Sequence, residues 1–141
     1  MSDRTFIDTN VLIYGHDVDA KAKHEIAKEV LAELWSQRNG ALSVQVLQEF
    51  YVNVTRKIPS PLPKRAARPI VESYTAWCIE TTPVEIATAF RLEDECRIGF
   101  WDALIVAAAL KCGAARILSE DLNAGQVVAG VRIENPFSRR A

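Results

Sequence analysis

The chain has 141 residues, of which 49% are hydrophobic and 25% are charged. These proportions match ordinary globular proteins and exclude a disordered or fibrous class, while the length predicts a single domain over residues 1–141. Its 17 basic and 18 acidic residues give a formal net charge of −1. A nucleic-acid partner would need a local basic patch or bridging metal ions, because the overall charge offers no attraction.

No segment has the pattern of a membrane span or a secretion signal. The longest apolar run covers residues 103–110, far short of the ~20 residues that cross a bilayer. Residues 1–5 are polar and lack the apolar core of a signal peptide. We therefore expect a cytoplasmic protein with no membrane partner.

The first half of the chain predicts two strands and three helices. Residues 4–8 have a short apolar core and predict a buried strand, and a helix is expected to start near Val11. Apolar residues at helical spacing between 26 and 35 predict a second helix. A very short strand is expected at 41–43, followed by an amphipathic helix over 47–58.

In the second half, prolines between 59 and 69 interrupt the pattern before a helix resumes over 69–74. Residues 77–80 predict a third strand. A capping box with proline at the first helical position, over 82–85, predicts the start of the next helix. The remaining predicted elements are a buried helix at 103–110 and two strands at 116–119 and 131–134.

This order of elements predicts an α/β fold. Strands separated by helices form parallel sheets through right-handed crossovers, and the helices cover both faces of the sheet. We therefore expect a three-layer α/β/α domain with a central parallel sheet of about five strands. In such sheets, the ligand site lies beyond the carboxyl ends of the strands.

Acidic residues occur near several of these strand ends. Asp8 follows the first strand, Glu120 and Asp121 follow the fourth, and Asp102 begins the helix that leads into it. Glu49 lies in the helix after the second strand, within reach of the same edge. Carboxylates 4 Å apart repel by ~4 kcal/mol per pair at an effective dielectric near 20, so a cluster protonates or binds a cation. Oxygen donors without His or Cys favour Mg²⁺ or Mn²⁺ over zinc.

Each acid also has a purely structural interpretation. Asp8 and Asp102 could cap the helices that follow them. Glu49 belongs to a polar stripe with Gln45 and Asn53, which is typical of a solvated helix face. The two acids after the fourth strand could be ordinary loop residues. Spacing and chemistry leave both interpretations open.

The segments that carry these acids resemble the four sequence motifs of PIN-domain ribonucleases. Residues 8–14 (DTNVLIY) and 43–50 (SVQVLQEF) are similar to the first two motifs. Residues 101–109 (WDALIVAAA) and 117–122 (ILSEDL) are similar to the last two. The acids follow the family's order at separations of 41, 53 and 19 residues. The resemblance covers nearly the whole chain, and a free-standing domain of this length most resembles the toxin half of VapBC-type toxin–antitoxin modules.

The resemblance implies a role for each acid. Asp8, Glu49 and Asp102 match the three acids that hold the metal in the family. Asp121 matches a fourth, more variable acid, and its place three residues after Leu118 favours it over Glu120 as the residue that faces the metal. Two polar positions that support the acids by hydrogen bonding are occupied here by Asn10 and Ser119.

The same resemblance implies an endoribonuclease that depends on Mg²⁺, with Mn²⁺ as the alternative ion. Metal-activated water would cleave the RNA, leaving a 5′-phosphate and a 3′-hydroxyl. The resemblance further implies a cognate antitoxin that blocks the site, and a homodimer. The alternative is a catalytically silent PIN-like scaffold that binds RNA or protein.

Two groups of residues could contact RNA. The first is a basic stretch, which could bind phosphates or form a solvated, Pro-rich helical connection. Its members are Arg56, Lys57, Lys64, Arg65 and Arg68. The second group comprises Trp35, Trp77 and Trp101, which we expect in the core and not as platforms for bases, because each lies in or beside an apolar pattern.

Overall fold

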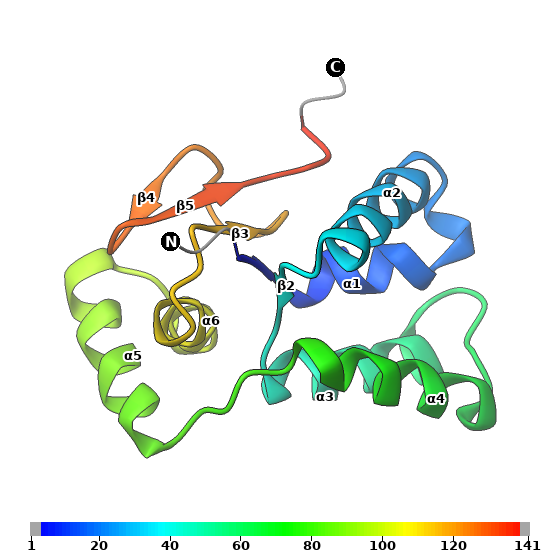
Figure 1. Cartoon of the computed structure of the whole chain (residues 1–141), viewed down its shortest axis with the longest axis horizontal. Helices are drawn as coiled ribbons and strands as arrows, with labels where there is room; N and C mark the ends of the chain where they lie inside the picture. The colour runs from blue at the N-terminus through cyan, green and yellow to red at the C-terminus, as the bar shows by residue number, and fades with distance from the viewer. Residues whose placement is uncertain (1–3, 139–141) are drawn as a thin grey trace.

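The computed structural model describes residues 4–138, in which a five-stranded sheet lies among helices (Figure 1). The strands are β1 (Thr5–Ile7), β2 (Gly40–Ala41), β3 (Arg116–Leu118), β4 (Val127–Val128) and β5 (Val131–Glu134). Their order across the sheet is β2-β1-β3-β5-β4, and only the β4–β5 pair is antiparallel. The predicted α/β class is confirmed.

Helices cover both faces of this sheet. Figure 1 shows α1 and α2 on one side and α5 and α6 on the other, while α3 and α4 pack together next to β2. The α-helices of the described chain are α1 (Thr9–His16), α2 (Ala22–Gln37), α3 (Val44–Val52), α4 (Lys64–Tyr74), α5 (Pro83–Cys96) and α6 (Phe100–Lys111). None of the helices within residues 4–138 combines the length and the hydropathy that a membrane span requires.

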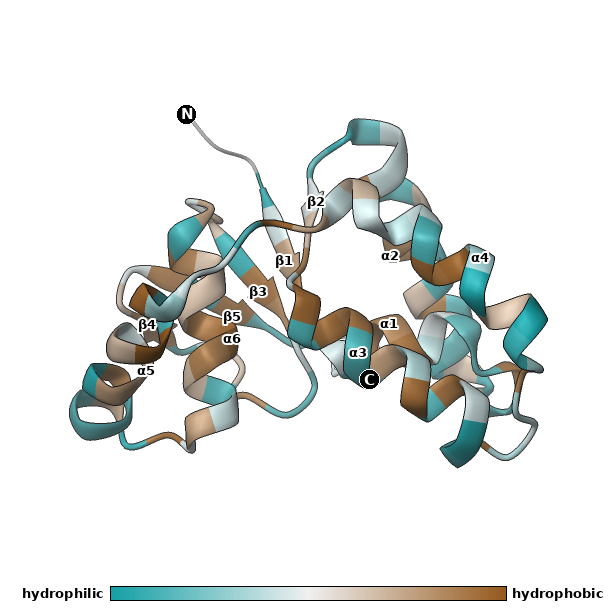
Figure 2. Cartoon of the chain, turned by 90° about the horizontal axis from the view of Figure 1, so that it is seen from below, coloured by the Kyte–Doolittle hydropathy of each residue, from teal (hydrophilic) through white to brown (hydrophobic). Residues whose placement is uncertain are grey.

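The core includes buried residues of α1, α2 and α3 as well as those of α6 and the central strands. Phe6, Ile7 and Ile117 on β1 and β3 are completely buried, which accounts for the short apolar runs in the sequence. Over residues 103–110 the α6 helix is apolar on all sides, and it packs against β3 and β5 (Figure 2). Because α6 is buried from Ala103 to Ala109 except at Leu104, the buried helix predicted from sequence is confirmed.

The strand predicted at residues 77–80 is wrong. A 3₁₀ turn covers Thr75–Trp77, and Cys78 forms a single parallel bridge with Leu42. The neighbouring strand β2 is only two residues long, so pairing does not extend further. The Trp77 ring also packs closely over Gly40, where an added Cβ would lie 2.6 Å from the ring.

The sheet instead gains β4, which the sequence pattern did not predict. Val128 pairs with Val131 across a two-residue turn formed by Ala129 and Gly130, which have φ angles of 52° and 89°. Two central residues with positive φ produce the tight turn that suits a hairpin's twist. The sheet is therefore mostly parallel, with one antiparallel strand at its edge.

Two helical predictions had the wrong boundaries. The helix predicted over 47–58 consists of α3 and a π-helical turn, η2 (Asn53–Lys57). The helix predicted over 69–74 begins earlier, at Lys64, and contains Pro69 inside it. Three of the predicted basic residues therefore lie on α4, a helix that Pro63 precedes.

Candidate active site

Asp8 lies at the carboxyl end of β1 and is only 6% exposed. The parallel register pairs Ile7 with Leu118, so the next residues, Asp8 and Ser119, lie at the same edge of the sheet. Ser119 donates its hydroxyl to Asp8 Oδ2 at 2.7 Å, and the Thr9 backbone N–H donates to Asp8 Oδ1 at 2.8 Å. Asp8 is thus the N-cap of α1, as its structural interpretation proposed, and also one member of a buried polar group.

Asn10 connects Asp8 to the acids that follow β3. Its Nδ2 atom donates to Asp121 Oδ2 at 3.1 Å and to Asp8 Oδ2 at 3.3 Å. Its Oδ1 atom accepts the Glu120 backbone N–H at 3.0 Å. One amide side chain therefore holds the turn after β3 against the start of α1.

Glu49 reaches the same edge from α3. It accepts hydrogen bonds from Thr9 Oγ1 at 2.5 Å and from Gln45 Nε2 at 3.3 Å. Gln45 also donates to the backbone carbonyl of Trp101 at 3.4 Å, which connects α3 to α6. The polar stripe on α3 thus takes part in contacts between elements. We did not predict Thr9 or Gln45 as supporting residues, although the i, i+4 spacing of Gln45 and Glu49 was a signal for that pair.

Asp102 lies in the first turn of α6 and does not cap it, because the N-cap is Gly99. The interpretation of Asp102 as a simple cap is therefore wrong. Asp102 and Asp121 line a cavity of about 230 Å³, and Arg97 lies in the same wall. Asp102 of α6 and Asp121 of the turn after β3 therefore line the same cavity.

Negative charge at this edge is costly. Burial raises the pKa of Asp8 to about 6, and the charges of Asp121 and Asp102 add to the increase, against hydrogen bonds from Ser119 and Thr9 that lower it. Burial also raises the pKa of Asp102, with further contributions from Asp121 and Glu49. Although Asp8, Glu49, Asp102 and Asp121 come from separate elements, these couplings show that their charges interact.

Glu120 belongs to a different group of contacts. It accepts a hydrogen bond from Tyr14 Oη at 2.7 Å and forms an ion pair with Lys23 on α2. Burial alone would raise the pKa of Glu120, but the hydrogen bonds from Lys23 and Tyr14 lower it overall. Glu120 is therefore already neutralised by a cation, whereas Asp121 lies beside Asp102.

The donor chemistry of the four acids suits a hard divalent cation, since every donor is a carboxylate oxygen. The raised pKa of Asp8 also favours a cation beside this acid, because a cation lowers the free-energy cost of ionising a buried carboxyl group. Within residues 4–138, however, no three Asp, Glu, His or Cys side chains converge into a metal-holding group. The carboxylates accept hydrogen bonds from Thr9, Asn10 and Ser119 instead of meeting at one point.

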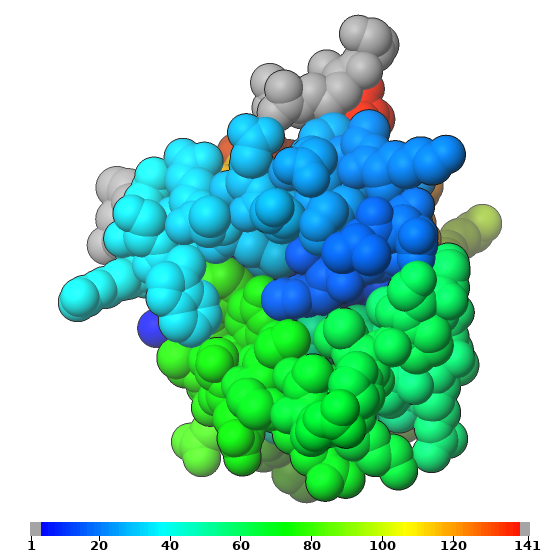
Figure 3. Space-filling model, turned by 90° about the vertical axis from the view of Figure 1, so that its right-hand side faces the viewer, coloured from blue at the N-terminus to red at the C-terminus, as the bar shows by residue number. Residues whose placement is uncertain are grey.

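The predicted basic residues lie on another part of the surface. Arg56 and Lys57 belong to η2, and Lys64, Arg65 and Arg68 belong to α4. All five are exposed. Figure 3 shows this segment, in green, next to α2, in blue to cyan, on one face of the molecule. Within residues 4–138, no hydrogen bond joins these five basic residues to the four acids.

The prediction that all three tryptophans lie in the core is wrong for two of them. Trp77 is buried, but Trp35 and Trp101 are 43% and 65% exposed. Trp35 packs on Trp77 at a ring-centroid distance of 5.0 Å, so it covers the edge of the core. Trp101 is the second residue of α6.

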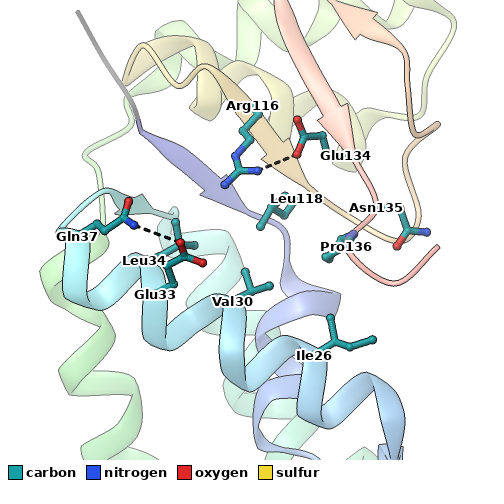
Figure 4. Close-up of a pocket in the computed structure, with 10 residues that line it drawn as sticks. All are labelled: Ile26, Val30, Glu33, Leu34, Gln37, Arg116, Leu118, Glu134, Asn135 and Pro136. Atoms are coloured by element: carbon teal, nitrogen blue, oxygen red, sulfur yellow. Dashed lines mark hydrogen bonds and ion pairs between the residues drawn. The ribbon is translucent and has the colours of Figure 1, made fainter. Parts of the chain in front are cut away.

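A second hollow lies between α2 and the sheet, away from the acids. Figure 4 shows Ile26, Val30 and Leu34 of α2 facing Leu118 and the segment 134–136. Its volume is about 360 Å³. Arg116 closes one end by pairing with Glu134 at 2.7 Å. None of the predicted site residues lines this hollow.

The fold and the motifs that supply these acids define a known class of protein. The family model of the PIN domain matches residues 5–129 of the chain. The chain therefore belongs to the PIN-domain family, and this part of the prediction is confirmed. A comparison with curated protein sequences gave no match.

Solved structures with the same fold include several toxin–antitoxin proteins. The Mycobacterium tuberculosis toxin VapC20, described as cleaving the sarcin–ricin loop, is 20% identical, with a TM-score of 0.62 over 83% of this chain and 89% of that chain. A toxin–antitoxin complex from Klebsiella pneumoniae is 18% identical, with a TM-score of 0.66 over 94% and 98%. VapBC2 from Rickettsia felis, bound to promoter DNA, is 18% identical, with a TM-score of 0.64 over 93% and 97%.

Proposed function

We propose that the protein is a metal-dependent endoribonuclease and the toxin of a type II toxin–antitoxin module. The observation that carries the proposal is the approach of four acids from four separate elements to one edge of the sheet. The charges of Asp121 and Asp102 raise the pKa of Asp8, and those of Asp121 and Glu49 raise the pKa of Asp102. Membership of the PIN-domain family and the similarity to toxin structures support it.

We assign metal binding to Asp8, Glu49, Asp102 and Asp121, with Mg²⁺ as the ion and Mn²⁺ as the alternative. When bound, a divalent cation neutralises charge on a phosphate and increases the acidity of a water molecule. Ser119 and Asn10 orient Asp8 through their hydrogen bonds, and Thr9 and Gln45 orient Glu49. Fixed carboxylates of this kind hold a charged site in place without rearrangement during reaction.

Cleavage of total cellular RNA by antitoxin-free protein tests the proposal. We expect discrete fragments with wild-type protein in Mg²⁺, and none with EDTA or with the Asp102→Asn variant. Asp94→Asn, an exposed acid on α5, is the matched control and should cleave normally. Cleavage that survives Asp102→Asn would show that the acids are not the site.

A catalytically silent scaffold is the second candidate. It is favoured because no three Asp, Glu, His or Cys side chains within residues 4–138 form a group that could hold a metal ion. Under this alternative, folded protein would leave every RNA intact in Mg²⁺ and in Mn²⁺. Calorimetry with each ion then separates a site that binds metal without reacting from one that binds none.

A cognate antitoxin is the proposed protein partner, and a homodimer is the proposed assembly. The apolar wall of the hollow beside α2, made by Ile26, Val30 and Leu34, offers a surface for an amphipathic antitoxin segment (Figure 4). Val30→Glu should weaken a complex with the antitoxin encoded beside the gene, measured by co-purification, while the free toxin still folds. Light scattering of the free protein tests the dimer.

A further inference from the structure

Arg97 lies beside the acids, in the connection between α5 and α6. It contributes to the wall of the 230 Å³ cavity that Asp102 and Asp121 also line. Its backbone is left-handed, with φ of 55°, and its N–H donates to the Glu93 carbonyl at the end of α5. Among residues 4–138, Arg97 forms no ion pair with an acid. A permanent positive charge therefore faces the cavity without a carboxylate partner.

Trp101 follows the same connection and is the second residue of α6. Its side chain is 65% exposed, and its ring contacts Phe100 in an edge-to-face arrangement at 5.2 Å. Its backbone carbonyl accepts a hydrogen bond from Gln45, which also donates to Glu49. Trp101 directly precedes Asp102 in the first turn of α6, so a large exposed aromatic ring lies on the same helical turn as one of the acids.

A polyanionic strand needs specific contacts to approach this edge. The acids repel phosphates, and the net charge of −1 provides no general attraction. Stacking of a base on an aromatic ring does not depend on charge and contributes ~1–3 kcal/mol per base. A guanidinium forms paired hydrogen bonds with phosphate oxygens. Trp101, next to Asp102 in the chain, and Arg97, in the cavity wall that Asp102 also lines, supply these two kinds of contact.

We propose that residues 97–101, which comprise the α5–α6 connection and the start of α6, clamp an unpaired nucleotide of the substrate. In this clamp, Trp101 stacks on a base and Arg97 binds a phosphate. This inference rests on the proposed ribonuclease function and narrows its substrate to single-stranded RNA or loops. Paired bases are already stacked in a helix and do not offer a face to the ring. Trp101, which the sequence pattern predicted to lie in the core, is thereby assigned a role in binding RNA.

The test measures the binding of a short, fluorescein-labelled single-stranded RNA of mixed sequence by fluorescence anisotropy. The buffer contains EDTA, so that the RNA is not cleaved during the measurement. Trp101→Ala should weaken binding by about fivefold to 150-fold with an unchanged salt dependence. Trp101→Phe should keep most of the affinity. Arg97→Gln should reduce the slope of log K against log salt by about 0.7, as loss of one phosphate contact requires.

Two exposed residues provide matched controls. Val18→Ala removes an apolar side chain that is 67% exposed, and Arg91→Gln removes an arginine from α5; both should bind like the wild type. The same RNA annealed into a duplex should not distinguish Trp101→Ala from the wild type. Each of these results supports the clamp.

Several results would overturn the clamp independently of the ribonuclease. One is equal binding of the single strand by wild type and Trp101→Ala, and another is no binding by the wild type, even if it cleaves RNA in Mg²⁺. A dimer that Trp101→Ala converts to a monomer, measured by light scattering, would assign Trp101 to contact between copies instead. Conversely, Trp101-dependent binding without cleavage in Mg²⁺ would retain the clamp and reject the ribonuclease.

Discussion

Ser119 donates its hydroxyl to Asp8 at 2.7 Å although the two residues are 111 positions apart. The same hydroxyl oxygen accepts the backbone N–H groups of Asp121 and Leu122 at 3.1 and 3.2 Å. One completely buried side chain therefore orients the acid after β1 and shapes the turn that carries the acid after β3. Its removal should affect both.

We expect Ser119→Ala to destabilise the protein by about 1–3 kcal/mol, because the buried Leu122 N–H, the partly buried Asp121 N–H and Asp8 each lose a hydrogen bond. Ser119→Thr keeps the hydroxyl and should recover part of this loss, with the remainder set by the fit of the added methyl group. Urea unfolding monitored by circular dichroism measures both variants. Unchanged stability of Ser119→Ala would show that water replaces the hydroxyl at no cost.

The pH dependence of stability should carry the signature of Asp8. Burial raises its pKa from 3.8 to about 6, so the folded state holds this proton more tightly than the unfolded chain does. The free energy of unfolding should therefore fall as the pH rises between these two values. The raised pKa of Asp102 acts in the same direction.

Asp8→Asn should remove most of this decline and increase the stability at pH 7 by up to about 3 kcal/mol. Asparagine is also a good N-cap, so α1 should persist. The measurement is urea unfolding between pH 4 and pH 7 in buffer without divalent cations, with exposed Asp94→Asn as the control. A wild-type stability that rises over this range would contradict the assignment.

The two acids after β3 should respond differently to isosteric neutralisation. Asp121→Asn is expected to reduce RNA cleavage by about 10- to 100-fold, because it removes a charge beside Asp102. Glu120→Gln removes only the ion pair with Lys23, a partly exposed contact, and should cost no more than about 1 kcal/mol of stability. Initial rates at saturating Mg²⁺ provide the comparison. The opposite ranking would mean that Glu120 faces the reaction.

Gly40 should tolerate a side chain poorly. An added Cβ would lie 2.6–2.8 Å from carbons of the Trp77 ring, and the ring is held by Trp35 and Tyr74. Gly40→Ala should therefore cost about 1–3 kcal/mol. The comparison is Gly15→Ala in α1, where the added methyl would clash with the flexible end of the Leu31 side chain and otherwise makes ordinary van der Waals contact. Helix propensity also offsets part of its cost, so thermal melting should show the smaller loss.

Much of the fold was predictable because local patterns report it directly. The apolar runs at β1, β3 and β5 and the apolar stretch 103–110 of α6 correspond to buried elements. The capping box at the start of α5 forms as predicted, with Thr82 and Glu85 bonded reciprocally. These signals act over a few residues, so one sequence is sufficient to read them.

The errors arose where distant contacts decided the outcome. Residues 77–80 have the composition of a strand, but the Trp77 ring packs against Gly40. The neighbouring strand β2 is also too short for residues 77–80 to pair with it along their length. The strand β4 is two residues long and depends on pairing with β5. Neither outcome follows from local propensity, because each depends on which segment lies alongside.

The sequence by itself determined the family, the α/β class and the chemical nature of the candidate site, because motifs and acid types are local properties. The metal-binding role of the acids remains a prediction. Only the tertiary structure decided that Glu120 pairs with Lys23, that Asn10 joins Asp8 to Asp121, and that Trp101 is exposed. The physical reason is that hydrogen bonds, ion pairs and burial depend on strand register and helix packing, which bring together residues that no short pattern relates.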